Sequence, residues 1–153
     1  MRRPLRAVPP WLFCLALFLA AASFAQAGPD DVAQIRHVIA TQFDKPDHPV
    51  VIDPVIVEGD HAIAGWTQGE GGGRALLRRS EGKWRVVLCG GDALKGADAI
   101  AQTGIAAVPA ATLAGRLAAA EKQLPPERRP LFSTFEGLMP MTSEGDDPHA
   151  GHH

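Results

Sequence analysis

The sequence contains no apolar run long enough to cross a membrane. The run from Trp11 to Ala22 is well short of the roughly 20 residues that a spanning helix needs. Arginines at positions 2, 3 and 6 precede this run, and Ala25-Gln26-Ala27 follows it. A basic segment, a short apolar segment and small residues at a cleavage position are typical of a secretory signal peptide. We therefore predict that residues 1–27 are removed on export and that the mature chain is not inserted in a membrane.

Cysteine is scarce as well. The 153 residues include two cysteines, Cys14 and Cys89, and Cys14 lies inside the predicted signal peptide. A single remaining thiol excludes an internal disulfide. An unpaired cysteine of an exported protein is either buried and inert, or it is reactive, bound to metal or paired between chains. We favour burial, because free cysteine is among the most buried residue types.

The sequence has no excess of basic residues. It holds 15 Lys and Arg against 17 Asp and Glu, for a formal net charge of −2, and removal of the three N-terminal arginines makes the mature chain more acidic. Nucleic-acid binding needs a basic surface, so we exclude nucleic acid as a partner. Internal repeats are absent too, and the remaining length suits one domain with a single core.

Residues 31–43 are predicted to form a helix, because apolar side chains recur there at helical spacing. Asp31 and Gln34 have the spacing of a capping box. The apolar positions are Val32, Ile35, Val38, Ile39 and Phe43.

Four segments indicate β-strands. Val50–Val57 is rich in β-branched residues, but Pro54 cannot donate to a central ladder, so this strand is expected either to lie at an edge or to be split. Three further runs are joined by glycine-rich and Ser-Glu-Gly turns, and they are 61–68, 74–79 and 83–89. Strict alternation in the last run would put Trp84, Val86 and Leu88 on one face and Arg85, Val87 and Cys89 on the other. We expect an antiparallel meander of three to four strands with one face under the helices.

The C-terminal part is predicted to be helical and then unpacked. Pro109–Gln123 has leucines at helical spacing, Leu113 and Leu117, with Pro109 suited to the first turn. Leu131, Phe132 and Phe135 follow as a last apolar cluster. Beyond Gly137 the composition is too polar to offset the entropy of folding. The fold class is therefore α+β, with one domain at 28–137 and a flexible tail at 138–153.

The tail, MPMTSEGDDPHAGHH, carries the donors that copper prefers. Imidazoles at His149, His152 and His153 suit Cu(II), and the thioethers of Met139 and Met141 suit Cu(I). A zinc site would normally have four ligands on fixed elements, which this segment lacks. We take these five residues as the candidate metal ligands; the alternative is a solvated tail without a specific role.

A thiol enzyme is the competing interpretation. Cys89 would be its nucleophile and His37 or His61 its base, but no local signature of a cysteine enzyme surrounds Cys89. Asp92, in the sequence CGGDALKG, is interpreted as a helix cap. The GEGGG segment is interpreted as a turn, because no Lys-Ser or Lys-Thr follows it as in a phosphate-binding loop.

Several segments resemble a known family. FDKP, DHAIAGWTQGEGGGRALLRR, VLCGGDAL and the histidine-ended tail are similar to the small exported bacterial proteins named copper uptake system-associated proteins. The resemblance spans nearly all of the mature chain. It implies a periplasmic accessory to copper handling whose partners are copper transport or copper chaperone proteins. It carries over no catalytic residue.

These observations lead to a functional hypothesis with two alternatives. We expect a periplasmic protein, not an enzyme, that binds or passes Cu(I) and Cu(II) through its Met/His tail. One alternative is a non-catalytic interaction module that docks on a copper transporter or chaperone. The other is the thiol enzyme based on Cys89.

Overall fold

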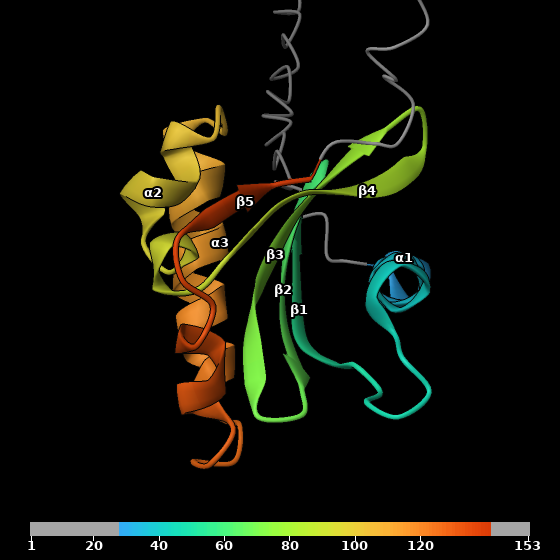
Figure 1. Ribbon diagram of the computed structural model, residues 1–153. Coiled ribbons are helices and arrows are strands. Elements are labelled where there is room, and N and C mark those ends of the chain that lie inside the picture. The colour runs from blue at the N-terminus through green and yellow to red at the C-terminus, as the bar shows by residue number, and fades with distance from the viewer. Residues whose placement is uncertain (1–27, 142–153) are drawn as a thin grey trace, which may run out of the picture.

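The fold is α+β, as the sequence predicts. The structure is a computed structural model, and it describes residues 28–141 (Figure 1). An antiparallel meander in the order β1-β2-β3-β4-β5 forms its sheet, with one strand more than expected. The elements are α1 (Pro29–Phe43), β1 (Val51–Glu58), β2 (His61–Gln68), β3 (Gly71–Ser80), β4 (Lys83–Gly90), η1 (Asp92–Leu94), α2 (Ala97–Gln102), α3 (Ala107–Glu121), η2 (Arg129–Ser133) and β5 (Leu138–Pro140).

Both faces of the sheet are covered, whereas the sequence led us to expect helices on one face only. In Figure 1, α1 lies on one side of the sheet and α2 and α3 lie on the other. Ala62, Ile63 and Ala64 of β2 are all buried, as are the consecutive residues 75–77 of β3. Continuous apolar runs of this kind are typical of strands that are buried on both faces.

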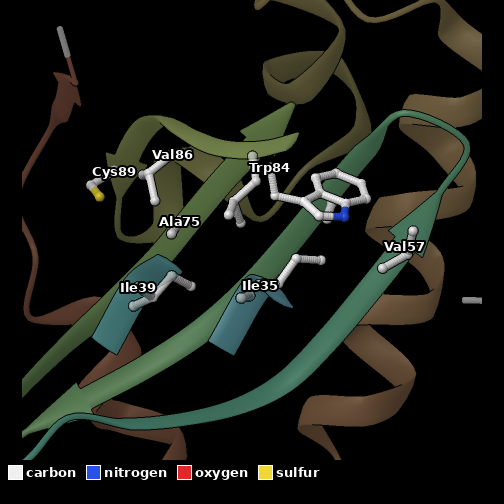
Figure 2. Packing of buried hydrophobic residues seen from close by; sticks show 10 residues of the cluster. Ile35, Ile39, Val57, Ala75, Trp84, Val86 and Cys89 are labelled. Carbon is white, nitrogen blue, oxygen red and sulfur yellow. The ribbon is translucent and has the colours of Figure 1, made fainter. Parts of the chain in front are cut away.

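The core therefore consists of two clusters, one on each side of the sheet. On the first face, Ile35 and Ile39 of α1 are fully buried and pack toward Ala75, Trp84 and Val86 (Figure 2). On the second face, leucines and isoleucines of β2, β3, α2 and α3 meet, and this cluster includes Ile63, Leu76, Ile100, Leu113 and Leu117. Leu113 and Leu117, which were predicted to lie on a helix, are both on α3 and are buried in this cluster.

A β-bulge in β4 changes the faces that simple alternation predicted. Leu76 pairs with Leu88, but Leu77 pairs with Val86, so Val87 is an extra residue in β4. Such an insertion reverses the inward and outward positions on its two sides. Trp84, Val86 and Cys89 consequently share the α1 face, and our assignment of Cys89 to the face opposite Trp84 was wrong.

The first helix begins differently from the sequence prediction. Its N-cap is Gly28, and no side chain caps it, so the capping box of Asp31 and Gln34 is not formed. The Asp31 carboxylate instead accepts hydrogen bonds from Arg79 Nη1 at 2.8 Å and from Trp84 Nε1 at 3.0 Å. Asp31 therefore fastens α1 to β3 and β4.

The edge position of β1 and the packing of Phe132 on the body of the domain are confirmed. Strand β1 lies at the edge of the sheet, and its pairing with β2 is irregular between Ile52 and Val55, where Pro54 stands. Phe132 is fully buried in η2. No helix among residues 28–141 is long and apolar enough to span a membrane.

Candidate functional site

Strand β5 places Met139 beside Cys89. The three residues of β5 pair with the end of β4, and Met139 is the direct partner of Cys89. The chain continues along β4, because the Met141 amide donates to the Val87 carbonyl at 3.0 Å. Positions 139 and 141 point to the same face of a strand, and Met141 packs against the α1-side cluster. The sheet thus extends beyond residue 138, where we had placed the start of the unpacked tail.

These three sulfur-bearing side chains line one small cavity on the α1 face. The cavity has a volume of about 130 Å³. Its wall also includes aromatic rings, and Trp66 and Phe135 meet edge to face with ring centroids 6.0 Å apart. The lining residues are Phe43, Trp66, Gln68, Cys89, Phe135, Met139 and Met141. We call this space the sulfur-lined cavity.

Burial controls the chemistry of Cys89. The residue is 4% exposed and is a free thiol at the end of the core cluster in Figure 2. Burial raises the pKa of the thiol to about 11, because a thiolate loses its hydration in an apolar environment. Cys89 is therefore a protonated thiol at neutral pH, as our interpretation of a buried cysteine predicted.

The histidines considered as a base for Cys89 do not lie at the cavity. His37 is exposed on α1. His61 pairs with Arg78 of β3, whereas Cys89 pairs with Ala75, three residues or about 10 Å along that strand. Burial, and then the charge of Arg78, lowers the pKa of His61. Neither His37 nor His61 is therefore in hydrogen-bond reach of the thiol, as a base must be.

The predicted copper ligands fall into two groups. Met139 and Met141 lie together at the sulfur-lined cavity, with Cys89 as a neighbour. His149, His152 and His153 lie outside the described residues, as does the predicted signal peptide. Between residues 28 and 141 no cluster of three or more His, Cys, Asp or Glu side chains could hold a metal ion, so sulfur is the donor that the described residues bring together.

Sequence reasoning missed Cys89 and Trp66 as neighbours of the methionines. The signal that could have found them was the spacing of Met139 and Met141, which suits one face of a strand. We overlooked it because the segment after Gly137 is polar and rich in proline and glycine. The segment pairs with β4, which is distant in the sequence, so the residues of the segment alone do not predict the pairing.

Asp92 also has a different role from the one predicted. It is the first residue of η1, whose N-cap Gly91 has no side-chain bond. The Asp92 carboxylate accepts a hydrogen bond from Ser133 Oγ at 2.7 Å and lies 3.4 Å from Arg74 Nη1. The Ser133 bond is the main cause that lowers the pKa of Asp92. Asp92 therefore joins η1 to η2 instead of capping a helix.

A second hollow of about 490 Å³ lies on the opposite face, near α2 and β5. Leu76, Leu88 and Leu138 line it together with Arg78 and Thr103. Among the described residues that line it, Arg78 is the one cation and none is a histidine, cysteine, aspartate or glutamate. The thiol of Cys89 and the two thioethers come together at the sulfur-lined cavity instead.

Comparisons with family models, with curated proteins and with solved structures gave no match. The family resemblance consequently rests on the sequence segments that carry it. The function has to be argued from the residues themselves.

Proposed function

We propose that the protein is a periplasmic accessory of copper homeostasis, not an enzyme, that binds copper ions and passes them to copper transport or copper chaperone proteins. The observation that carries this proposal is the position of Met139 and Met141. They lie on one face beside Cys89 and line one cavity. Thioether and thiol sulfur are soft donors that favour Cu(I).

The segment that follows adds donors of a second kind. His149, His152 and His153 come shortly after Met141 in the chain, and imidazole suits Cu(II). Thioethers beside a histidine-rich segment would let one protein accept copper in either oxidation state. A short histidine segment can also release its ion by ligand exchange without unfolding the domain.

The test is a copper titration of the mature chain, beginning at Gly28, and of the same chain ending at Met141. A cut at Gly137 would remove β5 from the sheet, so the cut after Met141 is the cleaner one. We expect the full chain to bind both ions and the shortened chain to keep Cu(I) and lose Cu(II). Failure of the full chain to bind either ion would refute the proposal.

Export is part of the proposal and has its own measurement. Signal peptidase requires small residues such as those in Ala25-Gln26-Ala27, so the mature N-terminus should be Gly28. Intact-mass measurement of the protein from a periplasmic extract tests this. Recovery of a membrane-bound form that retains Met1 would contradict it.

One observation favours the interaction module as a second candidate. Strand β5 pairs only with residues 88–90 of β4, and within residues 28–141 the part of β4 from Lys83 to Arg85 has β3 as its only partner. An edge of this kind can accept a strand from another protein. A copper transporter or chaperone that bound the copper-free protein, while the protein itself bound no copper, would favour this candidate.

A further inference from the structure

The three sulfur-bearing side chains at the cavity differ in their exposure to solvent. Cys89 is 4% exposed, whereas Met139 is 54% exposed, and Met141 is intermediate. The thiol is thus on the protein side of the cavity and one thioether borders the solvent. An ion that entered from solvent would meet a thioether first and the thiol last.

The other residues of the cavity wall offer few donor atoms that could compete with sulfur for a metal ion. Phe43, Trp66 and Phe135 contribute aromatic rings. The Gln68 amide is held in place, since Nε2 donates to the Phe43 carbonyl at 2.9 Å and to the His48 carbonyl at 2.6 Å, and its oxygen is a hard donor that suits Cu(I) poorly. Among residues 28–141, the wall contains no carboxylate and no cationic side chain. Sulfur is therefore the main donor type that faces this space.

The apolar wall also restricts the charge of an ion that could stay there. Moving a net charge from water into an apolar environment is costly unless the charge is paired. One thiolate neutralises a monovalent ion, and two thioethers add no charge. A divalent ion in the same place would leave one positive charge uncompensated. The charge of the site and the softness of its donors both favour Cu(I) over Zn(II) and Cu(II).

We propose that Cys89, Met139 and Met141 bind one Cu(I) ion in the sulfur-lined cavity. This inference rests on the proposed copper function, and it moves the Cu(I) site from the tail into the folded sheet. On binding, a bond forms between copper and the Cys89 sulfur while the S–H bond breaks, and the proton passes to solvent. Each methionine sulfur donates a lone pair and keeps both of its bonds to carbon. Copper remains Cu(I), so the step needs no oxidant or reductant.

The two donor groups therefore have separate tasks. The sulfur-lined cavity holds Cu(I), and the histidines at 149, 152 and 153 bind Cu(II) or capture ions for transfer. The site also gives β5 a function. Pairing with β4 fixes Met139 opposite Cys89, so that the ligands of one ion come from two segments held by backbone hydrogen bonds.

The experiment measures Cu(I) affinity of the mature chain without oxygen, in competition with a chromophoric Cu(I) chelator. Cys89→Ser, Met139→Leu and Met141→Leu each remove one sulfur. The leucine variants conserve volume, so they should remain folded. The matched control replaces His149, His152 and His153 together with alanine and keeps every sulfur. Circular dichroism and urea unfolding show whether each variant is folded.

We expect one Cu(I) per chain, and each sulfur variant should lose more than the roughly 10–100-fold in affinity that removal of an outer-shell partner costs. The histidine control should bind Cu(I) as the unaltered chain does. A second measurement, the protection of Cys89 from alkylation, uses the unaltered chain. Bound Cu(I) should protect Cys89 from iodoacetamide, and Ag(I), which is also soft and monovalent, should do the same while Zn(II) should not.

The possible failures can be told apart. If the full chain binds Cu(I) but loses it in the histidine control and keeps it in the sulfur variants, the site proposed here is wrong and the copper function stands. If Cys89→Ser loses Cu(I) while both methionine variants keep it, the three-sulfur site is likewise wrong. If the full chain binds neither Cu(I) nor Cu(II), both proposals fail.

Discussion

Arg74 of β3 and Glu121 of α3 form a buried, two-pronged ion pair across the interface between the sheet and the helix. Arg74 Nε lies 2.7 Å from Oε1 of the carboxylate, and Nη2 lies 2.9 Å from Oε2. Arg74 is 1% exposed and Glu121 is 8% exposed. The remaining nitrogen, Nη1, donates to the Gly91 carbonyl at 2.9 Å. The pair thus connects the strand, the helix and the start of η1 at a single point.

Removing one partner of this pair should destabilise the fold strongly. Glu121→Gln leaves the buried Arg74 charge with only the exposed Asp92 carboxylate, 3.4 Å from Nη1, as a counter-charge, and breaking a buried ion pair in this way costs about 3–5 kcal/mol. The matched control is Glu58→Gln, because the Glu58 carboxylate is more exposed and lies 3.4 Å from Arg116. A partly exposed pair contributes about 0–1 kcal/mol. Urea unfolding of the two variants measures the difference, and equal effects would contradict the structural role of Glu121.

Asp31 should matter through its tertiary contacts and not as a helix cap. Asp31→Asn weakens the bonds to Arg79 and Trp84, and we expect a loss of about 1–3 kcal/mol in the free energy of unfolding. Gln34→Ala is the control, because Gln34 is exposed and no capping bond is present at the start of α1. It should change stability by less than about 0.5 kcal/mol. A larger loss of stability for Gln34→Ala than for Asp31→Asn would contradict this prediction and support the capping box.

The comparison of sequence with structure shows which features are local. The Ser-Glu-Gly turn was predicted from its own residues, and Glu81 and Gly82 both have positive φ, at 52° and 73°, as a tight hairpin turn requires. The edge position of β1 was one of the two outcomes expected from Pro54 alone. The helix at 109–123 followed from leucine spacing and is observed as α3.

The features that were missed are nonlocal. Arg74 reads as one exposed charge in an apolar strand, and its burial depends on Glu121, 47 residues later. The bulge at Val87 follows from how β3 and β4 pair. The place of Met139 follows from where the chain returns after η2. In each case the deciding partner lies in another element, so the local pattern could not reveal the faces of β4 or the donor set at Cys89.

Two glycines should respond in opposite ways to alanine. A Cβ on Gly91 would overlap the Phe135 carbonyl oxygen, whereas a Cβ on Gly115 would meet nothing within 4 Å. Gly91→Ala therefore has to displace the segment that leads into β5, and we expect overpacking to cost about 1–3 kcal/mol. Gly115→Ala lies in the exposed middle of α3 and should stabilise by about 0.5–1 kcal/mol. Thermal unfolding measures both, and two shifts of the same sign would contradict this account.

The reactivity of the Cys89 thiol should depend on pH in a way that reflects its burial. Burial disfavours the thiolate and raises the pKa to about 11, so the copper-free protein should react slowly with iodoacetamide near neutral pH. The rate should rise about tenfold per pH unit toward that value, since only the thiolate reacts. In urea the same thiol should titrate near its ordinary pKa. A rate in the folded protein that levels off near pH 8 would show that the thiol is not buried.

The Cu(I) affinity of the whole chain should rise with pH, because each bound ion displaces one proton from Cys89. Below a pKa of about 11 the thiol is protonated, so the affinity should increase about tenfold for each pH unit. Thioethers carry no proton in this range, and a site made only of Met139 and Met141 would show no such slope. Cys89→Ser should therefore bind weakly and with little pH dependence. Cu(II) held by histidines should behave differently, weakening only as pH falls below about 6.5. Chelator competition for Cu(I) at several pH values measures the slope, and a flat profile in the unaltered chain would remove Cys89 from the ligand set.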